Sequence, residues 1–201
     1  GKPLADPRRR RITDAISILK SQRFVTEDPQ AGTSAGRQGP FEFEFDDCDE
    51  AVAAFRKRLP DMAALIKAIS IAELELGNRY HEKWHDEFFE GFNANALGPE
   101  DIALFPSYLV SVVGKPVTAK LKAGILETLG SGLPFKILIQ HDDILGPPPD
   151  ATGQLSFGVR GQQLAGMALG LNQVFVLQAA SSALYRLREP LIRGLGSRLP
   201  A

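Results

Sequence analysis

The chain has 201 residues, of which 44% are hydrophobic and 23% charged, and its formal net charge at pH 7 is −1. This is the composition of a globular protein that can bury a core, without the net basic charge that would favour nucleic acid as a partner. A single cysteine excludes an internal disulfide and favours a reducing, cytoplasmic location, and no apolar run of the sequence approaches the roughly 18 residues of a membrane span.

The N-terminal part of the chain is predicted to contain a short helix, a linker and an edge strand. Apolar residues at helical spacing predict an amphipathic helix over residues 12–22. Gly, Pro, Ser, Gln and Thr dominate residues 26–40, which indicates a linker. The strict alternation over residues 41–45 places three phenyl rings on one face of a half-buried edge strand. We expect the basic residues 8–11 and the acidic residues 42–50 to be solvated surface.

Two further helices are predicted on either side of Pro60, because proline disfavours a continuous helix. Asp49 can cap the first helix and Asp61 the second, whose apolar stripe ends near Gly77. Charged and aromatic residues then crowd positions 79–92.

The second half of the chain alternates between apolar runs and helical patterns. The expected order is strand, helix, strand, helix, strand and a final helix kinked at Pro190, over residues 109–113, 117–129, 133–140, 164–171, 174–178 and from about 182. A crossover helix makes consecutive strands parallel and covers the sheet, so such strands can be continuously apolar. We therefore predict an α/β domain with a parallel sheet at residues 105–201, preceded by a mostly helical and irregular region at residues 1–104.

The sharpest short motif is the H-E-x-x-H string of His81, Glu82 and His85. On a helix, two histidines four residues apart share a face and can bind zinc, with the glutamate as general base to a bound water, as in a zinc hydrolase. A third ligand is required, and the downstream candidates are Glu100, Asp101 and His141. The motif is short and lies among charges, so a surface helix decorated with His and Glu is the competing interpretation.

A second polar cluster, His141, Asp142 and Asp143, directly follows the apolar run at residues 133–140. Ligands of parallel sheets bind beyond the carboxyl ends of the strands, and Mg²⁺ prefers carboxylate oxygens, so the cluster predicts a magnesium or phosphate site. The same aspartates can cap a turn that leads into the Gly-Pro-Pro-Pro run at residues 146–149. Both interpretations remain open at this point.

Four segments follow one another in the second half of the chain: LETLGSGLPFKILI at 126–139, TGQ at 152–154, LAGMALGL at 164–171 and VFVLQA at 174–179. This order, over about residues 105–201, resembles the thiamine-diphosphate-binding domain of the pyruvate:ferredoxin (2-oxoacid:acceptor) oxidoreductases. The resemblance implies that domain's α/β fold, and residues 1–104 have no counterpart in it.

The resemblance also implies a site for thiamine diphosphate and Mg²⁺. In the family, a strand that ends in Gly-Asp-Gly supplies an aspartate to the magnesium; the matching residues here are Val113, Gly114 and Lys115, so the aspartate is absent. The loop after the next strand implies a side-chain metal ligand at Asp142 and a backbone carbonyl ligand at Ile144. The cofactor-binding residues implied in this way are His141, Asp142, Asp143, Ile144, Gly153 and Gln154.

The function implied by the resemblance is that of a segment of an enzyme that decarboxylates a 2-oxoacid on thiamine diphosphate. Electrons would pass to iron–sulfur clusters outside this one-cysteine segment, and the partners would be other domains or subunits of the same homo-oligomeric oxidoreductase. The missing aspartate leaves a second hypothesis open, a degenerate α/β domain that serves packing or partner binding without chemistry. The start without methionine, and the end after a helical pattern where such a fold would next supply a strand, lead us to expect a fragment of a longer protein.

Overall fold

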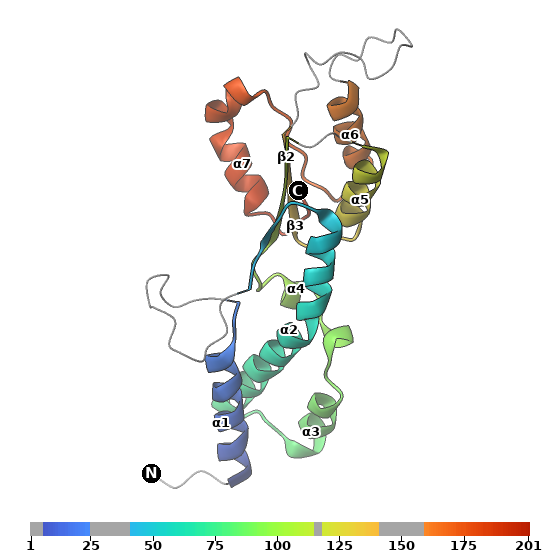
Figure 1. Ribbon diagram of the computed structural model, residues 1–201. Coiled ribbons are helices and arrows are strands. Elements are labelled where there is room, and N and C mark those ends of the chain that lie inside the picture. Colours follow the sequence, from blue (N-terminus) through green and yellow to red (C-terminus); the bar gives the residue numbers. More distant parts are fainter. Residues whose placement is uncertain (1–5, 25–40, 115–117, 141–158) are drawn as a thin grey trace, which may run out of the picture. The chain divides into compact units, whose positions relative to one another are not determined.

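The structure is a computed structural model that describes residues 6–24, 41–114, 118–140 and 159–201 (Figure 1). The chain divides into two compact units. Unit 1 is drawn from residues 1–42 and 55–106, and unit 2 from residues 43–54 and 107–201. The linker predicted at residues 26–40 lies outside the described residues. In the part of the chain that is described, no helix is both long and apolar enough to cross a membrane.

Unit 1 is helical. Its elements are α1 (Asp6–Ser21), the part of α2 (Cys48–Leu76) from Phe55 onward, α3 (Glu82–Glu90), the short 3-10 helix η1 (Ala94–Ala96) and α4 (Pro99–Ile102). Its buried apolar side chains are those of Ala15, Phe24, Phe55, Met62, Ala63, Ile66, Ala68, Phe89 and Phe105. The ring of Phe24 contacts the rings of Phe41 and Phe105, with centroid distances of 4.9 and 4.6 Å. These contacts connect the loop residue Phe41 to the core.

Two of the four arginines at residues 8–11 are not the solvated surface that the sequence predicts. Arg11 Nε lies 2.6 Å from Glu75 Oε1, and Arg8 Nε lies 3.1 Å from Glu75 Oε2. Arg11 also reaches Glu82 of α3, with Nη1 to Oε1 at 3.0 Å. Because Glu75 is buried, its carboxylate requires counter-charges. The pairing of Arg8 and Arg11 with Glu75 explains why α1 starts at Asp6 rather than at residue 12.

Helix α2 is continuous through Pro60, so the prediction of two helices is wrong. A proline inside a helix removes one backbone hydrogen bond and crowds the preceding turn. Here the buried face continues on both sides of the proline, with Ala51 and Phe55 before it and Met62 and Ile66 after it. Burial along this one stripe offsets the local defect and keeps the helix in one piece.

Unit 2 is built on a three-stranded parallel sheet in the order β1-β2-β3, which confirms the predicted mixed α/β class with a parallel sheet. Its strands are β1 (Glu44–Phe45), β2 (Tyr108–Val113) and β3 (Phe135–Gln140). The predicted edge strand at residues 41–45 is thus shorter than expected. Phe43 and Phe45 contact Tyr108, with ring centroids at 5.3 and 5.9 Å, whereas Phe41 contacts Phe24.

Helix α5 (Ala119–Gly130) connects β2 to β3 and packs against β3 and against α6 (Val159–Leu169). In Figure 1, α5 and α6 lie on one side of the sheet and α7 (Arg188–Leu195) on the other. The buried residues shared by the sheet and its helices are Tyr108, Val110, Val112, Ile125, Leu129, Phe135, Leu164 and Ala168. On the opposite face of the strands, Val113 and Leu138 stay about half exposed, at 49% and 51%.

The strand predicted at residues 174–178 is absent from the described sheet, and this prediction is wrong. The place beside β3 is taken by Ala201, whose N–H donates to Phe135 O at 3.0 Å and whose carbonyl accepts from Ile137 N–H at 2.5 Å. Phe175 N–H donates instead to Pro200 O at 2.9 Å. The residues before Ala201 therefore lie between β3 and Phe175.

The final helix is not a single kinked helix. The chain forms the 3-10 helix η2 (Ser181–Leu187) and then α7, with a change of backbone conformation at Leu187. Pro190 lies in the first turn of α7, where its missing N–H would have had no partner within the helix. The proline is thus accommodated in the first turn of a helix, where a kink was predicted.

Candidate functional site

The carboxyl ends of β2 and β3 lie at the same edge of the sheet, because the two strands are parallel and paired from Tyr108↔Phe135 to Val113↔Gln140. This edge is where ligands of open parallel sheets bind, and it is where the sequence predicts a cofactor site. In open parallel sheets, the ligand crevice usually lies where the strand order reverses its direction. The described sheet has the order β1-β2-β3, which runs in one direction, so the described part contains no such reversal.

Gly114 follows β2 at this edge and stands where the resemblance would require an aspartate. Its φ of +66° lies in the left-handed region, which glycine adopts without strain. A Cβ placed on Gly114 would meet no atom of the described residues within 4 Å, so these residues leave the space beside the backbone open. The described edge therefore supplies no carboxylate from β2, and this feature does not fit the magnesium site that the resemblance implies.

The other predicted ligands cannot be compared with this geometry. His141, Asp142, Asp143, Ile144, Gly153 and Gln154 all lie outside the described residues. The sequence places the first of them directly after Gln140, the last residue of β3. The magnesium ligands Asp142 and Ile144 therefore stay predictions.

The H-E-x-x-H string lies at the start of α3, and its two histidine rings are stacked with their centroids 6.1 Å apart. His81 is the N-cap, with φ −122° and ψ 110°, so it precedes the helix that carries His85. The Nδ1 atom of His85 accepts a hydrogen bond from His81 N–H at 2.9 Å. This bond occupies one of the two ring nitrogens that could bind a metal and ties His85 to the N-terminus of its own helix.

Within the described residues, no third metal ligand joins these histidines, and the candidate His141 lies outside them. Across the described ranges, no group of three or more His, Cys, Asp or Glu side chains is placed to hold a metal ion. Asp101 instead accepts a hydrogen bond from Gly98 N–H through Oδ2, at 2.9 Å, and so caps α4. Cys48 is buried, and this burial raises the pKa of its thiol, which disfavours the thiolate that binds metals.

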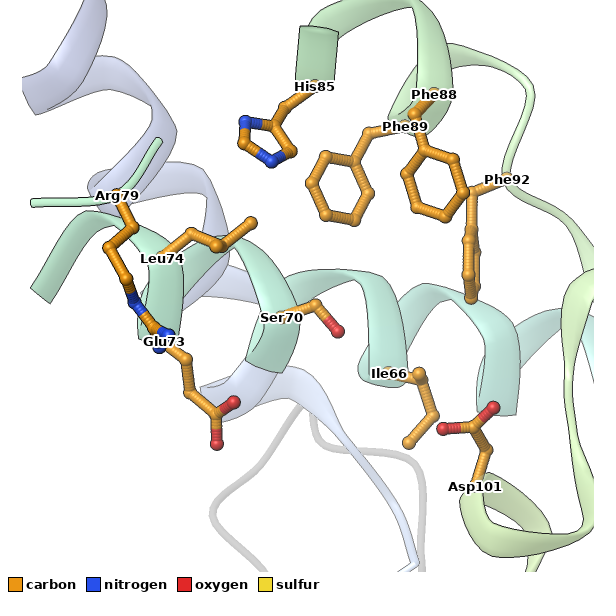
Figure 2. Close-up of a pocket in the computed structure, with 10 residues that line it drawn as sticks. All are labelled: Ile66, Ser70, Glu73, Leu74, Arg79, His85, Phe88, Phe89, Phe92 and Asp101. Atoms are coloured by element: carbon orange, nitrogen blue, oxygen red, sulfur yellow. The ribbon is translucent and has the colours of Figure 1, made fainter. Parts of the chain in front are cut away.

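Unit 1 contains a groove of about 390 Å³ between α2 and the segment that begins with α3 (Figure 2). One wall carries a row of rings in the order His85, Phe89, Phe88 and Phe92, and the other carries Ile66, Ser70 and Leu74 of α2. Glu73, Arg79 and Asp101 complete the lining. We call this feature the α2/α3 groove.

The aromatic wall of the α2/α3 groove is a packed cluster. The centroid of Phe88 lies 5.1 Å from that of Phe89 and 5.9 Å from that of Phe92, both in edge-to-face geometry. Phe89 is buried, whereas Phe88 is 58% exposed and presents its ring to the groove. Rings held by one another in this way keep their orientation without a ligand.

No sequence pattern predicts the α2/α3 groove. The density of aromatic and charged residues at 79–92 was visible, but it does not indicate which element faces those rings. The apolar stripe predicted for this part of α2 consists of Met62, Leu65, Ile66, Ile69 and Leu76, and it includes neither Ser70 nor Leu74. Ser70 lies one helical turn from both Ile66 and Leu74 and is the available signal, because a hydroxyl there indicates a position that is not packed as core.

No protein family model, curated protein or solved structure matches the chain. The candidate sites are therefore assessed on their own geometry.

Proposed function

We propose that the chain is a divergent segment of a 2-oxoacid:ferredoxin oxidoreductase-like protein, with a thiamine-diphosphate-binding-like domain over about residues 105–201. The observation that carries this proposal is the parallel, in-register pairing of β2 with β3 across α5. It aligns the ends of the two strands that, in the family, are followed by the cofactor ligands. The order of the four sequence segments at 126–179 supports the same assignment.

A second function, a non-catalytic α/β domain that serves assembly, is favoured by Gly114. A diphosphate needs the charge of its cation, and that cation needs carboxylate oxygens. Gly114 contributes none, so no catalytic step through thiamine diphosphate is derived for this chain. Both functions share the fold of unit 2 and differ in whether the edge at Gly114 and Gln140 binds a cofactor.

Thermal unfolding with and without thiamine diphosphate plus Mg²⁺ separates the two functions. A ligand at about a hundredfold over its Kd stabilises the protein by roughly 2.7 kcal/mol. An upward shift of Tm that Asp142→Ala abolishes, and that the exposed Asp14→Ala on α1 retains, supports the cofactor-binding function. The absence of a shift in the folded protein supports the non-catalytic domain.

A substitution at Gly114 that restores cofactor binding would show that the absence of the aspartate at this position weakens the site. Gly114→Asp restores the missing carboxylate into open space, at a backbone cost of about 1–2 kcal/mol for a side chain in the left-handed region. Gly114→Asn is the matched control, because it tolerates the same backbone without supplying a charge. Thiamine diphosphate plus Mg²⁺ should stabilise Gly114→Asp more than Gly114→Asn. Equal responses of the two variants would contradict the alignment of Gly114 with the family's aspartate.

A further inference from the structure

Helix α7 of unit 2 packs against its own unit through Gly194, which is buried. A Cβ added at Gly194 would lie 2.5 Å from the ring of Phe175, so the helix approaches that ring more closely than a larger residue would allow. After the helix, Lys136 Nζ donates to the carbonyls of Ser197 and Leu199 and ties the following residues to the sheet. These contacts fix the rotation of α7 about its own axis.

The apolar side of α7 faces away from this contact. At 100° per residue, Leu191, Leu195 and Ile192 lie about 60°, 100° and 160° around the helix from Gly194. These residues are 40%, 51% and 56% exposed, so exposure rises with the angle from the packed side. We call the three residues the α7 stripe. An apolar stripe of a surface helix ordinarily faces the core, whereas this one is presented to the surroundings.

Positive charge accompanies the α7 stripe, although the formal net charge of the whole chain is −1. Residues 181–201 contain one acidic residue, Glu189, and four basic ones, which are Arg186, Arg188, Arg193 and Arg198. Arg188 lies about 120° from Gly194 and therefore within the stripe, at its N-terminal end. Arg188 and Arg193 are exposed, and the ion pairs of the described residues involve neither of them.

We propose that the α7 stripe binds the surface of a bilayer that contains anionic lipids. Its three aliphatic side chains enter the boundary between the headgroups and the acyl chains. Arg188, placed among them, extends its guanidinium outward to the lipid phosphates, while its apolar stem stays at the boundary. This binding surface is separate from the edge of the sheet and does not depend on the function proposed for that edge.

The small size of the α7 stripe favours a bilayer over a protein partner. The eight residues of α7 span only about 12 Å. A stable protein interface requires about 800 Å² and 20–30 residues on each side, which three aliphatic residues and one arginine do not supply. A bilayer makes no such demand, because it accepts a short apolar face and its surface charge attracts the neighbouring arginines.

The test is flotation of the whole chain with lipid vesicles of two compositions. Vesicles of phosphatidylcholine alone are neutral, and vesicles with about 30% phosphatidylserine carry the negative charge that attracts arginines. A single short stripe should bind reversibly, with half of the chain bound at an accessible lipid concentration on the order of 0.1–1 mM. Binding to the charged vesicles should be at least about fivefold stronger than to the neutral ones. It should weaken as salt is raised, because exposed charges are screened.

Two pairs of variants assign the binding to α7. Ile192→Gln removes the most exposed side chain of the stripe and should weaken binding about fivefold or more. Leu169→Gln makes the same change of polarity at a 62% exposed position of α6, on the other side of the sheet, and should change binding less than about twofold. Arg188→Gln should weaken binding about fivefold, whereas Lys120→Gln, at an exposed position of α5, should leave it unchanged.

A tryptophan in the α7 stripe would report the contact directly. Trp84 is the only tryptophan of the chain, so Ile192→Trp in a Trp84→Phe background leaves one indole, at the stripe. Its emission should shift to shorter wavelength when charged vesicles are added, because the indole moves from water to the bilayer boundary. Leu169→Trp in the same background should keep its emission spectrum.

Several outcomes would overturn the proposal. Failure of the folded chain to float with charged vesicles would exclude the bilayer as the partner. Equal binding to neutral and charged vesicles would exclude the role of the arginines, and equal losses in Ile192→Gln and Leu169→Gln would place the contact elsewhere. Binding of a poly-glutamate peptide without binding of vesicles would assign the stripe to an acidic protein. Self-association that Ile192→Gln abolishes, again without binding of vesicles, would assign it to a second copy of the chain. The replaced side chains are exposed, so these variants are expected to fold.

Discussion

Each unit contains a charged side chain that is only 3% exposed, and the two units neutralise these charges in different ways. In unit 1, Glu75 is 3% exposed and its carboxylate meets the guanidinium groups of Arg8 and Arg11. In unit 2, Lys136 of β3 is also 3% exposed, but its Nζ donates to two backbone carbonyls, at 2.7 Å to Ser197 and 2.5 Å to Leu199. A full counter-charge stabilises the first, and only carbonyl dipoles stabilise the second.

The difference shows what each charge holds in place. Glu75 of α2 pairs with Arg11 of α1, and Arg11 also pairs with Glu82 of α3, so these charges link three helices. Lys136 holds the residues that precede Ala201 against the sheet, where Ala201 itself pairs with β3. Burial lowers the pKa of Lys136, as expected for an ammonium group that has no counter-ion among the described residues.

Removing Glu75 should have the larger effect on stability. Glu75→Ala leaves two partly buried guanidinium groups without their carboxylate, and removing one partner of a fully buried pair costs about 3–5 kcal/mol. Because the side chains of Arg8 and Arg11 are 32% and 20% exposed, water can replace part of the lost interaction, and we expect about 2–3 kcal/mol. Urea unfolding measures this loss, and the exposed Glu90→Ala is the control. A loss below about 0.5 kcal/mol would show that the Glu75 pairs are only surface ion pairs.

Replacing Lys136 should have a smaller effect. Lys136→Met keeps most of the buried volume but leaves the carbonyls of Ser197 and Leu199 without a donor, at about 1–2 kcal/mol. The substitution also removes the desolvation cost of the buried ammonium group, which offsets part of that loss in stability. Lys120→Met, at an exposed position of α5, provides the control in the same urea experiment. A variant at least as stable as the parent would mean that the carbonyl bonds do not compensate for burial of the charge.

The two units should also respond differently to alkaline pH. A lysine whose folded pKa is lowered binds its proton less tightly in the folded state, so its burial destabilises the protein fully below the folded pKa. That penalty is relieved as pH rises from the lowered pKa towards the ordinary value of about 10.4, and stability rises through this window. The difference in unfolding free energy between the parent and Lys136→Met should therefore change in favour of the parent in this window. A pH-independent difference would mean that Lys136 titrates normally.

The smallest expected effect is the shifted ionisation of a single side chain, that of Tyr80 in unit 1. Burial, followed by the hydrogen bond to Asp86 and the charge of that carboxylate, raises the pKa of its phenol to about 12. The neutral phenol is favoured in the folded state, so this contribution to stability is present below pH 10 and is lost as pH rises towards 12. Absorbance of tyrosinate at 295 nm should show a component that ionises near pH 12. It should disappear in Tyr80→Phe, and its persistence in that variant would assign it to another tyrosine.

Much of the secondary structure was predictable because it depends on local pattern. The helix at residues 117–129 and the apolar runs at 109–113 and 133–140 correspond to α5, β2 and β3, with the inward residues Ile125 and Leu129 as expected. The error at Pro60 arose because a local rule about proline competes with burial along a stripe of α2, and only the folded chain shows that the stripe continues. The error at residues 174–178 had a similar cause, because an apolar run does not indicate which strand takes the place beside β3.

The candidate sites depend more heavily on tertiary structure. The sequence by itself determined the α/β class, the parallel order of β2 and β3 and the absence of an aspartate at Gly114, because these follow from residue type and from short connections. Only the tertiary structure decided that Glu75 meets Arg11, 64 residues away, and that Lys136 reaches Ser197, 61 residues away. It also decided that the rings of Phe88 and Phe92 face Ser70 across the α2/α3 groove. The physical reason is that periodicity records which face of an element is apolar, whereas the partner of that face is chosen by packing of the whole chain.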